Sequence, residues 1–188
     1  MESGENKLTS PWPAWKRRLD KEIGAADRIV VLAIGNKSKR DDAAGLLSAE
    51  GLKKLLRGIA LRSLKIILGF EAPENTTGEI RKFNPDLVLI LDAADGQYEP
   101  GTVFIAEKDR IKDEGVSTHQ ISLALLASYL EETVGCNVTV LGIQPLDLGF
   151  GEDVSECVKK SVAKLANDLA EIFMVHFPRR GRLKKEPA

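Results

Sequence analysis

Five short apolar runs alternate with longer amphipathic segments along the middle of the chain. Most of these runs are apolar at nearly every position rather than at every second one, which is typical of strands covered on both faces. We predict five strands, at Arg28–Ile34, Leu64–Leu68, Asp86–Leu91, Thr102–Ala106 and Asn137–Ile143.

The segments between these runs place apolar residues at helical spacing. They predict helices at Asp41–Leu56, Gly78–Phe83, His119–Val134 and Asp153–Phe173. Alternating strands and helices indicate an α/β fold: one three-layer, doubly wound domain with a mostly parallel five-stranded sheet flanked by helices. We expect strand order 2-1-3-4-5, in which the short link Ala93–Gly101 allows the third and fourth strands to be antiparallel.

The two ends of the chain differ from its middle. We assign residues 1–26 to an N-terminal tail and short helix, residues 27–177 to the α/β domain, and residues 178–188 to a basic C-terminal tail. Trp12 and Trp15 should dock the first helix onto the flank of the sheet. The basic tail is either solvated or a contact arm for an acidic partner.

Composition narrows the class of protein. The 188 residues include 27 Lys and Arg against 28 Asp and Glu, a net charge of −1 that argues against binding nucleic acid or anionic lipid. Two cysteines exclude a disulfide framework and a four-cysteine zinc site. No apolar run is long enough to span a bilayer, and the polar N-terminus is not a signal peptide. We expect a cytoplasmic monomer with no nucleic-acid partner and no membrane insertion.

Chemistry in a doubly wound sheet is expected beyond the carboxyl ends of the first and third strands. Asp41 and Asp42 follow the first strand, Asp92 ends the third, and His119 begins a later helix. Asp42, Asp92 and His119 could therefore converge, and two carboxylates with one imidazole suit a borderline divalent metal such as nickel, zinc or iron.

Each of these residues also has a plain structural interpretation. Asp41 and Asp42 stand where an acid can cap a helix. Asp92 could accept backbone hydrogen bonds in the following turn, and His119 could be an incidental first-turn residue.

Familiar catalytic motifs are absent. The sequence has no Gly-x-Ser-x-Gly elbow, no phosphate-binding P-loop and no His-Glu-x-x-His. We interpret Cys136 and Cys157 as buried or half-buried apolar residues and His176 as a surface residue. A phosphoacceptor receiver domain is an alternative, but it needs a lysine at the end of the fifth strand, where this sequence has Ile143-Gln144-Pro145.

Several short motifs, in this order, resemble the nickel–iron hydrogenase maturation endopeptidases. The motifs are Gly35-Asn36, Asp41–Gly45, Asp92-Ala93 followed by Pro100–Thr102, and Thr118–Gln120. Ala72–Asn75 and Leu141–Pro145 resemble the branch that serves membrane-bound, hydrogen-evolving enzymes of the formate hydrogenlyase type. The resemblance extends from about Arg28 to Phe173.

This resemblance implies an aspartic-type endopeptidase that removes the C-terminal extension of a hydrogenase large-subunit precursor. It implies that Asp42, Asp92 and His119 bind a metal and also form the catalytic set, with no separate nucleophile. The metal would be nickel already inserted in the precursor, so no tightly bound cofactor is expected. A generic metal-dependent hydrolase and a non-cleaving, nickel-checking chaperone of the precursor remain alternatives.

The sequence departs from the family pattern in two places. Lys37–Arg40 brings three cations into a loop that is usually apolar. These cations could stabilise the ionised acids or contact an acidic precursor segment. Leu68–Glu71 lacks the usual aspartate, whose role is lost or has moved to Glu71.

Overall fold

The computed structural model describes residues 13–57, 62–106 and 120–177. Its strands are β1 Ile29–Ile34, β2 Leu64–Phe70, β3 Leu87–Ala93, β4 Val103–Ala106 and β5 Asn137–Ile143. Its helices are α1 Ala14–Gly24, α2 Ala44–Leu55, α3 Thr77–Phe83, α5 Gln120–Val134 and α6 Glu156–His176, with 3₁₀ turns η1 Arg40–Ala43 and η2 Pro73–Thr76. The predicted α/β class is confirmed, and most boundaries lie within three residues of those expected.

The strands form one sheet in the order β2-β1-β3-β5-β4. β4 runs antiparallel to β5, and the other pairs are parallel. The predicted order of the last two strands is therefore wrong, because β5 lies between β3 and β4. β5 is buried along almost its whole length and needs a neighbour on each side, whereas the four-residue, partly exposed β4 suits an edge.

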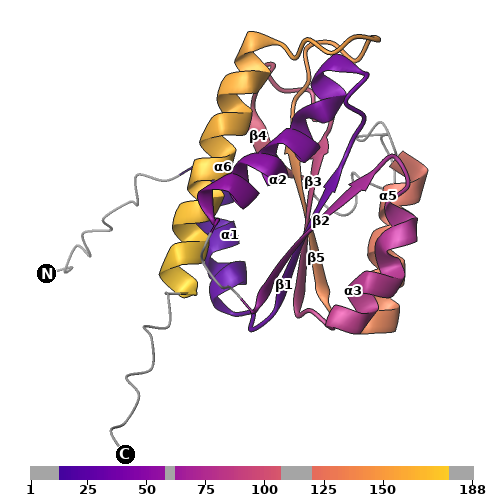
Figure 1. Ribbon diagram of the computed structural model, residues 1–188, viewed down its shortest axis with the longest axis vertical. Helices are drawn as coiled ribbons and strands as arrows, with labels where there is room; N and C mark the ends of the chain where they lie inside the picture. Colours follow the sequence, from indigo (N-terminus) through magenta and orange to yellow (C-terminus); the bar gives the residue numbers. More distant parts are fainter. Residues whose placement is uncertain (1–12, 58–61, 107–119, 178–188) are drawn as a thin grey trace, which may run out of the picture.

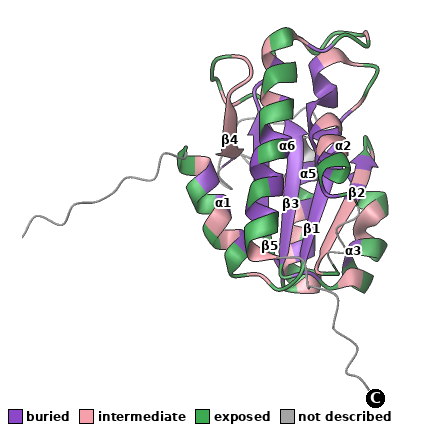
Figure 2. Ribbon diagram, turned by 60° about the vertical axis from the view of Figure 1, so that its left-hand side comes forward, coloured by how far each residue is buried: buried purple, intermediate pink, exposed green. Residues whose placement is uncertain are grey.

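Alternate residues of each central strand face two different cores. In β1, Val31 and Ala33 point toward α1, α2 and α6, and Val30 and Leu32 point toward α3 and α5. The two helical layers enclose the sheet in Figure 1, and the central strands are buried throughout in Figure 2. This two-sided burial explains why the strands read as continuous apolar runs.

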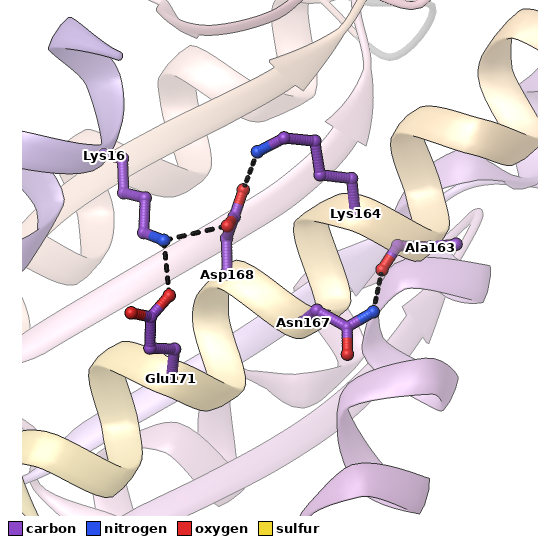
Figure 3. Close-up of polar contacts among 6 residues, drawn as sticks. All are labelled: Lys16, Ala163, Lys164, Asn167, Asp168 and Glu171. Carbon is purple, nitrogen blue, oxygen red and sulfur yellow. Dashed lines mark hydrogen bonds and ion pairs between the residues drawn. The ribbon is translucent and has the colours of Figure 1, made fainter. Parts of the chain in front are cut away.

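The first helix packs against α6, with Leu19 and Ile23 fully buried and Trp15 partly buried on the same core. Lys16, which is 3% exposed, lies at this contact. Its ammonium nitrogen is 2.8 Å from Asp168 Oδ1 and 2.6 Å from Glu171 Oε2. Figure 3 shows Asp168 between Lys16 and Lys164. An ionic cluster thus joins α1 to α6, and Trp12 lies outside the described residues.

Both cysteines and His176 can be located in the fold. Cys136 is buried and Cys157 is partly buried, as expected. His176 is more than a surface residue, because its Nε2 lies 2.8 Å from Asp20 Oδ1 and so links α6 to α1. The basic tail 178–188 lies outside the described residues. Among the helices of the described ranges, none has the length and apolar character to cross a membrane.

Candidate active site at the carboxyl edge of the sheet

Two glycines let the turn after β1 fold down onto the sheet edge. Gly35 has φ +139°, and a Cβ there would lie 2.0 Å from the carbonyl oxygen of Asp42. A Cβ on Gly45 would lie 2.3 Å from the Leu91 carbonyl oxygen and 2.5 Å from that of Ile34. Only glycine permits such approaches. Gly35 therefore lets the turn pack against η1, and Gly45 seats the start of α2 directly on the ends of β1 and β3.

Asp42 and Asp92 both lie at this switch point. Asp42 belongs to η1 and is 1% exposed, whereas Asp92 belongs to β3 and is fully buried. η1 packs against β3, and β3 is the parallel neighbour of β1. Asp42 Oδ2 and Asp92 Oδ1 are both shielded from solvent. The fold thus buries both acids on neighbouring elements at the carboxyl edge of the sheet, where ligands bind in such sheets.

The third predicted member of this site, His119, lies outside the described residues. The described part of α5 begins at Gln120, immediately after it. Within the described ranges, no group of three or more His, Cys, Asp or Glu side chains could hold a metal ion. Two buried carboxylates are therefore the potential metal ligands that the structure describes at this edge.

Asp41 does not cap a helix, so that prediction is wrong. No side-chain hydrogen bond caps η1 or α2. Instead, Asp41 Oδ2 accepts N–H bonds from Leu146 (2.8 Å) and Asp147 (3.0 Å), and Oδ1 accepts one from Ser155 (2.7 Å). These donors are more than 100 residues away along the chain. Asp41 thus fastens the loop between β5 and α6 to η1.

The hydrogen bonds of Asp41 also determine its ionisation. Burial raises the pKa of this carboxyl, but the N–H groups of Ser155, Asp147 and Leu146 together outweigh burial and hold the pKa below its ordinary value. Asp41 is therefore an ionised structural anchor with both oxygens in use.

The three cations of the loop after β1 contact groups other than the carboxylates of Asp41 and Asp42. Lys37 Nζ lies 2.7 Å from Glu50 Oε1, and Arg40 Nη1 lies 2.9 Å from Asp147 Oδ2. The Lys39 ammonium lies 5.9 Å from the centre of a phenyl ring, that of Phe150. The expected stabilisation of the ionised acids thus comes, for Asp41, from backbone N–H groups and not from these cations.

Gln144 positions the loop that follows β3, a role that the sequence did not predict. It is buried, and its Oε1 accepts N–H bonds from Gly96 (2.9 Å) and Tyr98 (3.2 Å). Its Nε2 donates to Asp95 Oδ1 over 3.2 Å. Gln144 therefore holds the loop that follows β3. A receiver domain would need a lysine here to bind a phosphoryl group, and this side chain is already engaged.

Asn36 performs a similar task beside β2. Its Nδ2 donates to Glu71 Oε1 over 2.6 Å, and its Oδ1 accepts the N–H of Ser38 over 2.7 Å. The Gly-Asn motif thus combines a glycine-only backbone with an amide that ties the turn to the end of β2. Glu71 accepts this hydrogen bond immediately after β2.

Comparison with known proteins identifies the family of this chain. Residues 51–172 match the family described as hydrogenase maturation protease. Hydrogenase 3 maturation protease of Escherichia coli K12 is 36% identical over 134 residues, which cover 71% of this chain and 83% of that protein.

Solved structures of this family share the fold. The crystal structure of the NiFe hydrogenase maturation protease HycI from Thermococcus kodakarensis KOD1 has a TM-score of 0.74 and 38% identity, covering 82% of this chain and 97% of its own. The solution structure of the endopeptidase HycI from Escherichia coli has a TM-score of 0.67 and 33% identity, covering 77% and 90%. This chain therefore belongs to the hydrogenase maturation protease family of peptide hydrolases.

Proposed function

We propose that this protein is the endopeptidase that removes the C-terminal extension of a NiFe hydrogenase large-subunit precursor. The observation that supports the proposal is the close packing of η1 and the start of α2 on the carboxyl ends of β1 and β3, where Asp42 and Asp92 are both buried. The names and folds of the relatives support the same reaction class.

The nickel ion belongs to the substrate in this proposal. Asp42 and Asp92 supply oxygen ligands, and the family resemblance adds the His119 imidazole. Three such ligands, without a thiolate or a second histidine, make a poor private site but suit a cation partly held by another protein. We therefore expect the isolated protein to hold no nickel tightly, and nickel already inserted in the precursor to serve as the recognition signal.

The two neighbouring aspartates divide the work. Asp41 uses both oxygens to accept backbone N–H groups, so it holds the loop between β5 and α6 in place. Asp42 then meets the nickel-bearing centre of the precursor together with Asp92. Docking positions the peptide bond that follows this centre above the sheet edge, and hydrolysis of that bond consumes one water.

The test compares precursor prepared with nickel and precursor prepared without it. Each is incubated with the protein, and the mass of the large subunit is measured. Trimming of the nickel-loaded form alone is expected. Equal trimming of both forms would contradict nickel recognition and favour a generic metal-dependent hydrolase. Binding without trimming of either form would favour the chaperone.

A further inference from the structure

The loop between β5 and α6 carries three exposed apolar residues within five positions of the sequence. Phe150 is 83% exposed, Leu146 is 62% exposed and Leu148 is 38% exposed. This loop lies at the carboxyl edge of the sheet, at the top of Figure 1, above the end of β3. Exposed apolar residues that form a contiguous patch are typical of interaction sites, and these three belong to one loop.

The backbone of this loop is held in place from the η1 side. Asp41 accepts three of its N–H groups. The Arg40 N–H donates to the Gly151 carbonyl over 2.7 Å, and the Gly151 N–H donates to the Ser38 carbonyl over 2.9 Å. The Arg40 guanidinium also donates to the Phe150 carbonyl over 3.3 Å. The chain thus fixes the backbone that carries three exposed apolar side chains, and a surface ordered in advance loses less entropy when a partner binds.

A cation completes this surface. The Lys39 ammonium lies 5.9 Å from the centre of the Phe150 ring. Among the described residues, no carboxylate forms an ion pair with Lys39. A positive charge beside apolar side chains fits an apolar segment that also carries an acidic side chain.

We propose that Leu146, Leu148, Phe150 and Lys39 form the docking surface for the precursor, and that they bind an apolar segment with a neighbouring acidic side chain. This inference rests on the proposed function and adds a second contact, separate from the nickel. Asp41 is its positioning residue. Asp41 holds the loop that carries this surface, and Asp41 is adjacent to Asp42 in the sequence. The docked segment is therefore held at a fixed distance from Asp42.

The experiment measures two quantities for each variant. One is the Kd for the nickel-free precursor, which the proposed function says is not cut; the other is kcat and KM for the nickel-loaded precursor. Phe150→Ser should weaken binding about tenfold or more and raise KM similarly, with kcat nearly unchanged. Phe150→Trp should retain binding. Val175→Ser, which alters another exposed apolar residue at the far end of α6, is the control and should change neither quantity.

Two further variants test the cation and the anchor. Lys39→Gln should weaken binding more at low salt than at high salt, because salt already screens the charge of the wild type. Asp41→Asn should weaken binding and also speed hydrogen exchange at the amides of Leu146, Asp147 and Ser155. Faster exchange with an unchanged Kd would remove Asp41 from the proposal.

The outcomes separate this inference from the proposed function. An unchanged Kd and KM in Phe150→Ser would overturn the docking surface even if the wild type trims the precursor. A Phe150-dependent Kd with no trimming by the wild type would support the surface and overturn the protease. If Phe150→Ser instead converts a dimer into a monomer without changing precursor binding, the surface joins two copies of this chain and the proposal is wrong.

Discussion

Two buried carboxylates in this protein remain ionised by different means. Asp168, at the contact of α1 and α6, lies between the ammonium groups of Lys16 and Lys164. Asp41, at the carboxyl edge of the sheet, is surrounded by backbone N–H groups. Burial raises the pKa of both acids, but their hydrogen bonds outweigh it and both pKa values lie below the ordinary range.

The difference distinguishes a structural contact from the proposed active site. In the cluster of α1 and α6, cations neutralise the acids, so the charges are balanced within the protein. At the sheet edge, backbone dipoles stabilise Asp41 without adding positive charge, and the cations at Lys37 and Arg40 pair with Glu50 and Asp147. Asp41 therefore keeps its negative charge through neutral hydrogen-bond donors, whereas Asp168 keeps its charge through cations.

The largest expected effect is a loss of activity, with little loss of stability, when an acid at the carboxyl edge of the sheet is replaced. Asp42→Asn and Asp92→Asn should each lower trimming of the nickel-loaded precursor by about 10²–10⁴-fold, by analogy with the loss of a catalytic acid or base. The shape of the side chain is kept, so the thermal midpoint should change little. The mass assay measures trimming, and thermal unfolding measures stability. A large drop in the midpoint with normal trimming would assign these acids to the fold instead.

Asp41→Ala should instead lower the stability of the protein while leaving kcat for trimming largely intact. Loss of three hydrogen bonds to a charged group should lower the free energy of unfolding by about 2–4 kcal/mol. Residual trimming should show a raised KM rather than a lost kcat, because the loop moves while Asp42 remains. Denaturant unfolding and steady-state kinetics test this pair of effects. Asp41→Asn, which retains one acceptor oxygen, should fall between the wild type and Asp41→Ala.

Lys16→Met should affect stability alone. Asp168 and Glu171 would lose a buried partner, and the free energy of unfolding should fall by about 1.5–3 kcal/mol. Lys164 is mostly exposed, so Lys164→Ala is a matched variant with an expected loss of about 0–1 kcal/mol. Trimming should stay at the wild-type rate in both variants. Equal losses for the two lysines would show that burial of Lys16 contributes nothing extra.

The smallest effect is a pH dependence. The lowered pKa values of Asp41 and Asp168 mean that both acids stabilise the fold above pH 3.8, their ordinary pKa, and lose this contribution as pH falls through the folded values. Lys16 acts in the opposite direction. Burial lowers its pKa, but bonds to Asp168 and Glu171 raise it overall, so its contribution is present below pH 10.5 and is lost as pH rises beyond its folded pKa.

This dependence can be measured by chemical unfolding at a series of pH values. Asp41→Asn should flatten the acid limb and leave the alkaline limb unchanged, whereas Lys16→Met should flatten the alkaline limb. An acid limb that Asp41→Asn does not alter would contradict the assignment of a lowered pKa to this carboxyl.

Much of the fold follows from local patterns. The apolar runs at Ile29–Ile34 and Asn137–Ile143 identify strands buried on both faces, and helical spacing identifies α6. The prediction that Asp42, Asp92 and His119 converge rests on the rule that parallel strands end at the same edge of a sheet, and it stays a prediction. The strand and helix predictions are confirmed because they depend on residues that are close in sequence.

Only the tertiary structure decided which distant groups meet. The sequence by itself determined the α/β class, the positions of its elements, the family motifs and the candidate acids. It left open that β5 lies between β3 and β4, that Lys16 joins Asp168, and that Asp41 anchors the loop preceding α6. An apolar run predicts that a strand is buried, but it does not predict which strands pair with it. A carboxylate can accept hydrogen bonds from the N–H groups of a nearby helix end or from N–H groups more than 100 residues away in the sequence. Packing of the whole chain selects among these partners.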